Sequence, residues 1–196
     1  MSAPIAHESC PEIHSDTAGL PCPICDSDQS GESLTVLDFD CRAFRNALGT
    51  FATGITVVTA LAPHGEWIGL TVSSFNSVSL DPPLILWSLA RTSPNLSAFE
   101  AASHYSVSVL SANQQAISDR FSARGGDRFD GIPVRIGMRG VPLVEGCCAW
   151  FECANEARYP GGDHVIFVGR VEHFGKGEVP SPLVFHDGRY CKLQSD

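Results

Sequence analysis

The amino-acid sequence predicts a mainly β protein, an antiparallel β-barrel with a few short helices. Three observations support this fold class: short segments rich in strand-forming residues recur along the chain, turn residues separate them, and helical patterns are few. Closing the sheet into a barrel would protect its edge strands from pairing with other chains. The 196 residues fit one domain with some spare length.

The first 36 residues differ from the rest in composition. They contain six acidic residues, no Lys or Arg, and many Pro, Ser and Gly. Such a segment cannot bury enough apolar surface to order itself, so we expect a disordered acidic tail at 1–36 and a folded domain at 37–196. The domain then carries 16 acidic and 13 basic residues, so most of the formal charge of −9 belongs to the tail.

Charge and hydropathy exclude two classes of partner. Nucleic acid or an anionic membrane surface would need a basic patch, which an acidic chain does not favour. No apolar run approaches the roughly 18 residues that a membrane helix needs, and the N-terminus has neither a basic nor a hydrophobic signal region. We therefore expect a cytoplasmic protein without nucleic-acid or membrane partners.

The eight cysteines are expected to be free thiols, because the cytosol keeps thiols reduced. Cys22 and Cys25 form a lone C-x-x-C motif, with Cys10, His7 and His14 upstream. A structural zinc site usually needs a second such pair, so a tail without metal is favoured over a zinc site. Three further cysteines lie in an apolar, strand-like stretch and are read as small core residues: Cys147, Cys148 and Cys153.

The folded part is expected to open with a helix. Asp38 or Asp40 can cap it and Gly49 can end it. Its apolar stripe consists of Phe39, Phe44 and Leu48. Two more short helices are expected at 93–102 and 113–121.

Strand patterns dominate the remainder of the chain. We expect strands at 55–61, 67–79, 84–89, 105–110, 147–158, 164–174 and 183–193. Turn residues separate them at 63–65, 81–83, 160–163, 175–177 and 187–188. No internal repeat is evident.

The stretch "TVSSFNSVSLDPPLI" has an unusual strand face. With a two-residue period, four hydroxyls surround one aromatic ring: Thr71, Ser73, Phe75, Ser77 and Ser79 share a face. The apolar run from Leu84 to Trp87 follows and reads as a strand buried on both sides. A hydroxylated face so close to the core raises the question of what lies against it.

The stretch "LARTSPNLSAF" predicts an anion site. Ser93 at N-cap and Pro94 at N1 would begin a helix directly after the buried strand. Its free backbone N–H groups, with Arg91 and the Thr92 and Ser93 hydroxyls, would form an anion cradle. The alternative is that Ser93 only caps its own helix.

Two other stretches carry candidate site residues. In "FATGITVVTA", Gly54 either lets the backbone approach a flat ligand closely or relieves a bend in the barrel. In "YPGGDHVIFVGRV", Asp163 and His164 lie on a Gly-rich turn that leads into a strand. An imidazole there can hydrogen-bond to or stack on an aromatic substrate, although a histidine at a turn can equally be only solvated.

Five segments in order give the chain a family resemblance. They are "FRNALGTFATGITVVTA", "GLTVSSFNSVSLDPPLILWSL", "YSVSVLSANQQAISDRFS", "GGDHVIFVGRV" and "PLVFHDGRYCKL". Over residues 39–193 the chain resembles the short-chain flavin reductases, which have an FMN-binding split-barrel fold. The resemblance implies an NAD(P)H-dependent flavin reductase, typically the reductase component of a two-component flavin-dependent monooxygenase, and usually a homodimer.

The resemblance also implies site residues. Thr53, Gly54 and Ile55 resemble a first segment near the flavin, and Thr71, Val72, Ser73 and Ser74 resemble the strand that contacts the ring and the ribityl chain. The phosphate end would comprise Ser88, Leu89, Arg91 and Ser93. His164 resembles the histidine that helps to place the nicotinamide and is the expected catalytic residue, and Tyr190 resembles a tyrosine near the same pocket. The hydroxylated face would then solvate the polar parts of a flavin.

The resemblance leaves the cofactors open between FMN and FAD, and between NADH and NADPH. No G-x-G-x-x-G motif follows a strand, so a Rossmann domain for the nicotinamide nucleotide is not supported. Three alternatives remain at this point: a flavin- or haem-binding module without turnover, an enzyme like pyridoxamine-phosphate oxidase, and a zinc-dependent interaction protein. The second would need a stronger basic phosphate clamp than Arg91 provides.

Overall fold

The computed structural model describes residues 40–179 and 181–193. The expectations for Asp38, Phe39, the acidic tail and its C-x-x-C motif lie outside these residues. Within them, no helix is long and apolar enough to span a bilayer.

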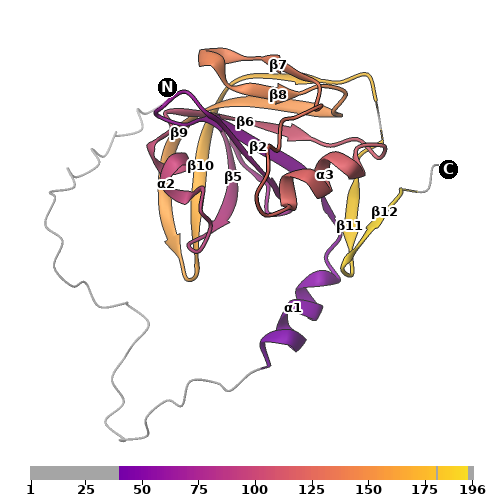
Figure 1. The fold of residues 1–196 in the computed structure, drawn as a ribbon. Helices are drawn as coiled ribbons and strands as arrows, with labels where there is room; N and C mark the ends of the chain where they lie inside the picture. Colours follow the sequence, from indigo (N-terminus) through magenta and orange to yellow (C-terminus); the bar gives the residue numbers. More distant parts are fainter. Residues whose placement is uncertain (1–39, 180, 194–196) are drawn as a thin grey trace, which may run out of the picture. The chain divides into compact units, whose positions relative to one another are not determined.

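A seven-stranded sheet forms the body of the fold (Figure 1), which confirms the predicted fold class. All its neighbouring strands are antiparallel. In spatial order the strands are β3 (Trp67–Val72), β2 (Thr56–Leu61), β6 (His104–Val109), β9 (Ala149–Gly161), β10 (His164–Lys176), β5 (Pro83–Ala90) and β4 (Asn76–Leu80).

The two edge strands of this sheet, β3 and β4, are consecutive in the chain. Only residues 73–75 join them, and a link of that length spans at most about 14 Å. The sheet must therefore curl until the end of β3 lies close to the start of β4. We call this junction, where the chain passes from one sheet edge to the other without a strand ladder, the seam.

Two small sheets complete the fold. β1 (Thr53–Gly54) pairs with β11 (Val184–His186), which forms a hairpin with β12 (Arg189–Cys191). β7 (Val134–Ile136) pairs with β8 (Pro142–Val144), and the short 3-10 helix η1 (Met138–Gly140) joins them. The sequence did not predict β7 and β8, because three residues are too few for a clear period.

The helices follow the predicted order. α1 (Cys41–Gly49) begins after Asp40, whose carboxylate accepts a hydrogen bond from the Arg42 N–H as predicted. α2 spans Leu96–Ala101 and α3 spans Gln115–Ser122. α3 packs on β3 where Gly69 has no side chain: a Cβ there would lie 2.6 Å from the Phe121 ring.

The main core is built around the fully buried Trp87. Its ring stacks on Phe167 with centroids 4.5 Å apart, while Phe99 and Tyr105 meet it edge-on at 5.2 and 5.6 Å. Buried aromatic pairs of this kind stabilise a fold beyond their area alone. The core also contains Cys153, and Cys147 and Cys148 are buried, so all three predicted core cysteines are confirmed.

Several element boundaries differ from those predicted. The strand expected at 67–79 is two strands interrupted at the seam, so its five residues do not share one continuous face. The turn expected at 175–177 is wrong in part, because β10 continues through Lys176. The segment 183–193 is a hairpin that turns at Asp187 and Gly188, both with positive φ, as the predicted turn there requires.

Candidate functional site

A groove of about 420 Å³ opens at the seam. Three segments line it: the end of β3 with the seam residues, the end of β5 with the loop that follows, and the first residue of β10. Its lining residues are Leu70, Thr71, Val72, Ser73, Ser74, Ser88, Leu89, Ala90, Ser93 and His164. Eight residues predicted from widely separated stretches of the sequence thus meet in one cavity.

Ser74 shapes the groove at the seam. The β4–β5 ladder ends at Leu86, which leaves the edge of β5 open beyond it. There the Ser74 hydroxyl accepts a hydrogen bond from the Ser88 N–H at 2.9 Å and donates to the Ser88 carbonyl oxygen at 3.3 Å. The Ser74 side chain therefore takes the place of a strand partner for Ser88. The backbone of Ser73 and Ser74 lies outside the strand ladder.

Thr71 connects the groove to α3 and to the C-terminal hairpin. Its hydroxyl donates to the Ser118 carbonyl oxygen at 2.7 Å, and the Ser118 hydroxyl lies 2.9 Å from the Tyr190 hydroxyl. Tyr190 also donates to Asp119 at 2.9 Å. Burial, with the Asp119 carboxylate close by, raises the pKa of Tyr190, so its phenol stays protonated. Because the Thr71 hydroxyl proton is donated to Ser118, this hydroxyl can only accept a hydrogen bond from a ligand.

His164 lies where the β9–β10 turn enters the groove, with its side chain 44% exposed. Its Nδ1 is 2.8 Å from the Asp163 carboxylate, and this hydrogen bond and the imidazole charge lower the pKa of Asp163. With Nδ1 engaged, Nε2 is the ring nitrogen left for a substrate. Asp163 therefore fixes the orientation of a partly solvated imidazole.

Arg91 does not line the groove, yet it holds two of its walls together. Its Nε donates to the Gly162 carbonyl oxygen at 2.9 Å, and its backbone N–H donates to the Asp163 carbonyl oxygen at 2.8 Å. These bonds join the loop after β5 to the turn that carries His164. The role of Arg91 at a phosphate stays a prediction.

The predicted helix start at Ser93 is wrong by two residues. α2 begins at Leu96 with Asn95 at the N-cap, and Pro94 lies in the preceding turn. The Ser93 hydroxyl instead accepts a weak hydrogen bond from the Asn95 N–H at 3.3 Å, and the Ser93 carbonyl accepts one from the Leu96 N–H. A hydroxyl-lined turn, rather than a long helix end, therefore closes this side of the groove.

The first predicted segment lies on β1 and beside it. Thr53 and Gly54 pair with β11, and Ile55 is buried in a cluster against which Tyr190 packs. None of the three lines the groove. A Cβ at Gly54 would meet no protein atom within 4 Å, so nothing in the described residues requires glycine there.

Comparison with known proteins assigns the family. A family model described as "Flavin reductase like domain" matches residues 48–194. The chain belongs to this family.

The relatives of this flavin reductase-like chain have consistent names. It is 49% identical to an FMN reductase (NADH), SmoA, from Agrobacterium fabrum, over 78% of this chain and 86% of the relative. It is 41% identical to the reductase component of a flavin-dependent trigonelline monooxygenase from Acinetobacter baylyi, over 68% of this chain but only 43% of that longer protein.

A solved structure supports the same assignment. The NADH:FAD oxidoreductase SgcE6 from Streptomyces globisporus, in complex with NAD and FAD fragments, superposes with a TM-score of 0.76. The two sequences are 35% identical, and the match covers 80% of this chain and 94% of that one. The split-barrel fold expected from the sequence is thus confirmed.

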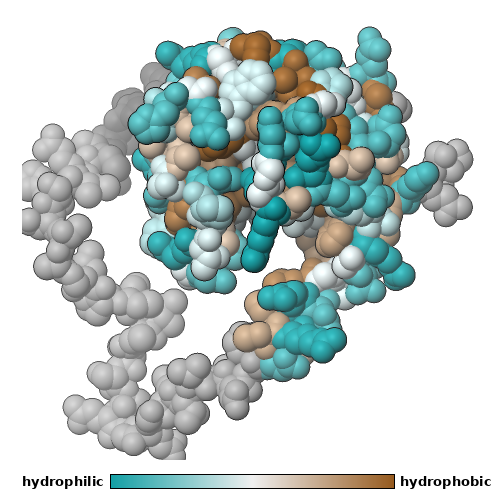
Figure 2. Space-filling view, in the orientation of Figure 1, coloured by the Kyte–Doolittle hydropathy of each residue, from teal (hydrophilic) through white to brown (hydrophobic). Residues whose placement is uncertain are grey.

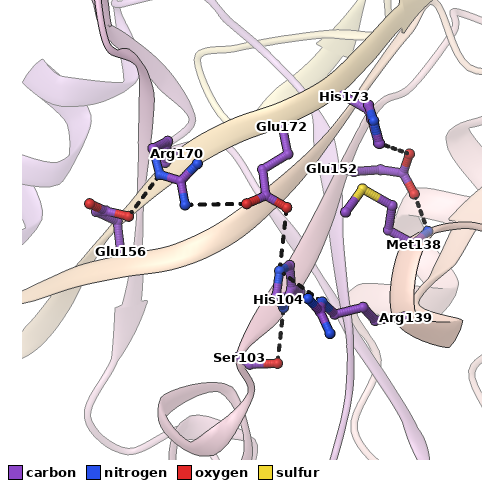
Figure 3. Close-up of polar contacts among 9 residues, drawn as sticks. All are labelled: Ser103, His104, Met138, Arg139, Glu152, Glu156, Arg170, Glu172 and His173. Carbon is purple, nitrogen blue, oxygen red and sulfur yellow. Dashed lines mark hydrogen bonds and ion pairs between the residues drawn. The ribbon is translucent and has the colours of Figure 1, made fainter.

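A second concentration of polar residues in the flavin reductase-like domain lies away from the groove (Figure 3). Arg170 bridges Glu156 and Glu172, and His104 lies between Glu172 and Arg139. Beside it, Glu152 accepts a hydrogen bond from the Met138 N–H and faces His173. Among the described residues, no cluster of His, Cys, Asp or Glu could hold a metal ion. We read this network as structural, because it fastens η1 to β9.

Sequence reasoning missed Ser118 and Asp119. Both lie on α3, within one of the five segments that carry the family resemblance, but the resemblance gave neither of them a site role. Only the packing of α3 between β3 and the C-terminal hairpin reveals that they connect Thr71 to Tyr190.

Proposed function

We propose that the chain is a flavin reductase that uses NADH to reduce FMN or FAD and supplies the reduced flavin to a partner monooxygenase. The observation that carries the proposal is the groove at the seam, where hydroxyl groups, open backbone and His164 converge in a flavin reductase-like domain. The names of the relatives support NADH as the hydride donor and an oxygenase as the partner.

The chemistry of the lining fits a flavin. Hydroxyl groups of Thr71, Ser73 and Ser74 suit the polar edge and sugar-alcohol chain of such a ligand, while Leu70 and Leu89 offer apolar contact for a flat ring. Ser88 and Ser93 lie at the other side of the groove and would meet the phosphate end, with Arg91 close behind. A cavity of about 420 Å³ has the size usual for a small-molecule site.

The bound flavin would supply the redox chemistry by accepting a hydride from the nicotinamide. The protein's part is to position both molecules. The backbone N–H groups at the seam would stabilise negative charge on the flavin ring, and His164 would orient the nicotinamide through its free Nε2. No residue has to give or take a proton for the hydride transfer itself.

The remaining predicted site residues act at a distance from the groove. Tyr190 would set the position of Thr71 through Ser118, and Ile55 packs beneath Tyr190. Thr53 and Gly54 would approach the flavin only from the β1–β11 side.

A steady-state assay tests the proposal. FMN, FAD and riboflavin are each combined with NADH and with NADPH, and nicotinamide oxidation is followed by absorbance. We expect oxidation that depends on added flavin and is faster with NADH. Flavin binding without oxidation of either nicotinamide would instead indicate a binding module, and no binding of any flavin would refute the proposal.

A further inference from the structure

An exposed carboxylate on α3, that of Asp119, ends a chain of hydrogen bonds that begins in the groove. Asp119 accepts the phenol proton of Tyr190 at 2.9 Å, and the Tyr190 oxygen lies 2.9 Å from the Ser118 hydroxyl. The Ser118 carbonyl oxygen accepts the hydroxyl proton of Thr71, which lines the groove, at 2.7 Å. This chain therefore connects β12 to β3 through α3.

The protons of this chain have one consistent arrangement. Tyr190 has a single hydroxyl proton, and that proton is donated to Asp119. The Ser118 hydroxyl must then be the donor in its contact with the Tyr190 oxygen. Asp119 thus fixes the direction in which the whole hydroxyl pair points.

Tyr190 is the side chain through which the C-terminal hairpin reaches α3. Its ring packs edge-on against Phe185 at 5.4 Å and against the buried cluster that contains Ile55. On α3, Ser118 is fully buried and Asp119 is exposed, in keeping with the hydrophilic residues that Figure 2 shows over this helix. The phenol therefore lies at the edge of the cluster, where both polar and apolar contacts hold the hairpin against α3.

The position of α3 decides whether Thr71 keeps its acceptor. The oxygen that takes the Thr71 proton belongs to the helix backbone, and it also accepts the hydroxyl proton of Ser122 at 2.8 Å. Phe121 fixes the helix at β3, where a Cβ on Gly69 would lie 2.6 Å from its ring. A shift of α3 towards or away from the hairpin would lengthen the Thr71 bond and release its proton.

The Thr71 hydroxyl, held in this way, offers a ligand lone pairs and no proton. Such a group favours ligand N–H and O–H groups over carbonyl oxygens and unprotonated ring nitrogens. A flavin has donors of two kinds. The ring N3–H and the sugar-alcohol hydroxyls are present in both redox states, whereas an N5–H exists only after the ring has accepted a hydride.

We propose that Asp119 and Tyr190 are positioning residues that fix Thr71 as a hydrogen-bond acceptor for the flavin. The inference rests on the proposed function. Neither residue has to touch the flavin, because both act through α3 and the Ser118 carbonyl oxygen.

A double-mutant cycle tests the proposal through binding. Thr71→Val removes the acceptor, and Thr71→Ser is the conservative variant that keeps it. Asp119→Ala and Tyr190→Phe break the same hydrogen bond from its two sides, so either one serves if the other melts early. Gln115→Ala, at an exposed position on α3, is the control. Circular dichroism and thermal melting of the flavin-free proteins check that each variant folds.

The dissociation constant of FMN is measured from quenching of tryptophan fluorescence, for oxidised FMN and, without oxygen, for reduced FMN. We expect Thr71→Val to weaken binding about fivefold in at least one redox state, and Thr71→Ser to bind as wild type does. Asp119→Ala and Tyr190→Phe should each weaken it about threefold in the same state, while Gln115→Ala has no effect. In the Thr71→Val background, Asp119→Ala should cause no further loss, because the group that it positions is absent.

The outcomes assign the donor and separate the hypotheses. Weaker binding of both forms of FMN assigns the donor to N3–H or a sugar-alcohol hydroxyl, and weaker binding of the reduced form alone assigns it to N5–H. If FMN binds but Asp119→Ala leaves its affinity unchanged, or lowers it by the same factor with and without Thr71, the positioning role is refuted and the proposed function stands. If the wild type binds no flavin in either state, both are refuted.

Discussion

At the scale of single residues, His164 is the side chain on which the proposed hydride transfer depends most directly. It is the one titratable group among the residues that line the groove, and Asp163 holds its imidazole in place. Substitution should therefore disturb the nicotinamide more than the fold, since the side chain is 44% exposed and packs on little.

We expect His164→Ala to raise the KM for NADH or to slow flavin reduction, by about tenfold in kcat/KM, because the nicotinamide loses an orienting contact. Steady-state kinetics with NADH measure the effect, and thermal melting should show little change. His64→Ala, in the exposed turn before β3, is the control. An unchanged kcat/KM would remove His164 from the site.

Cys153 gives a prediction for stability at high pH. Burial, with Glu172 and Glu152 nearby, raises the pKa of its thiol from 9.0 to about 12. Between these values the unfolded chain releases a proton that the folded chain retains, so the free energy of unfolding falls as pH rises. The fall should not exceed about 1.4 kcal/mol per pH unit for this group.

Urea unfolding at pH 8 and at pH 10 tests this expectation. Cys153→Ala should lose less stability between the two pH values than wild type does, whereas Cys41→Ala, at an exposed position on α1, should behave as wild type does. An equal loss in wild type and Cys153→Ala would show that the thiol does not cause it.

At the scale of secondary-structure elements, the seam between β3 and β4 forms one wall of the candidate site. Ser74→Ala should open it, because the Ser88 N–H and carbonyl lose their partner. We expect flavin affinity to fall about fivefold and the free energy of unfolding to fall by about 1 kcal/mol. Fluorescence titration and urea unfolding measure these effects. Ser77→Ala on exposed β4 should change neither, and equal flavin affinity in the two variants would contradict the role of Ser74.

The polar network of Figure 3 joins η1 to β9. Glu152 is buried, and its carboxylate accepts a hydrogen bond from the Met138 N–H at the start of η1. Glu152→Ala should lower the free energy of unfolding by about 2 kcal/mol, because it leaves that N–H without its acceptor. Flavin reduction by the folded variant should stay near the wild-type rate; a selective loss of activity would contradict a structural role.

The long strands could be predicted from the sequence, since β5, β6 and β10 have clear hydrophobic patterns over six residues or more. The seam could not, because Ser73, Ser74 and Phe75 continue the two-residue period of β3 into β4. The start of α2 was misplaced for a related reason: Ser-Pro reads as a helix start, while the chain makes a turn there first. The family resemblance pointed to residues that line the groove, such as Ser74 and His164, but gave no role to Ser118 or Asp119 on α3.

At the scale of the whole molecule, the division into an acidic tail and a folded domain remains a prediction. Deleting residues 1–36 should leave flavin reductase activity largely unchanged, because that segment is too polar to form a core of its own. Activity, melting temperature and zinc content of the full-length and truncated proteins test this. Loss of folding, or stoichiometric zinc in the full chain alone, would show that the tail is structural.

The homodimer implied by the family resemblance also remains a prediction. Large apolar side chains are exposed on and beside α1 and on β4, where Leu48 is 58%, Phe51 73% and Leu80 95% exposed. Such groups are common at subunit contacts. Sedimentation velocity measures the oligomeric state directly.

The gap in the sheet at residues 73–75 should make the order of this segment depend on whether a flavin is bound. A flavin bound as proposed would lie against backbone groups of these residues that have no strand partner, and its hydrogen bonds to them would stabilise the junction of β3 and β4 only while it is bound. Amide deuterium uptake on these three residues should therefore slow when the site fills and recover when the reduced product departs.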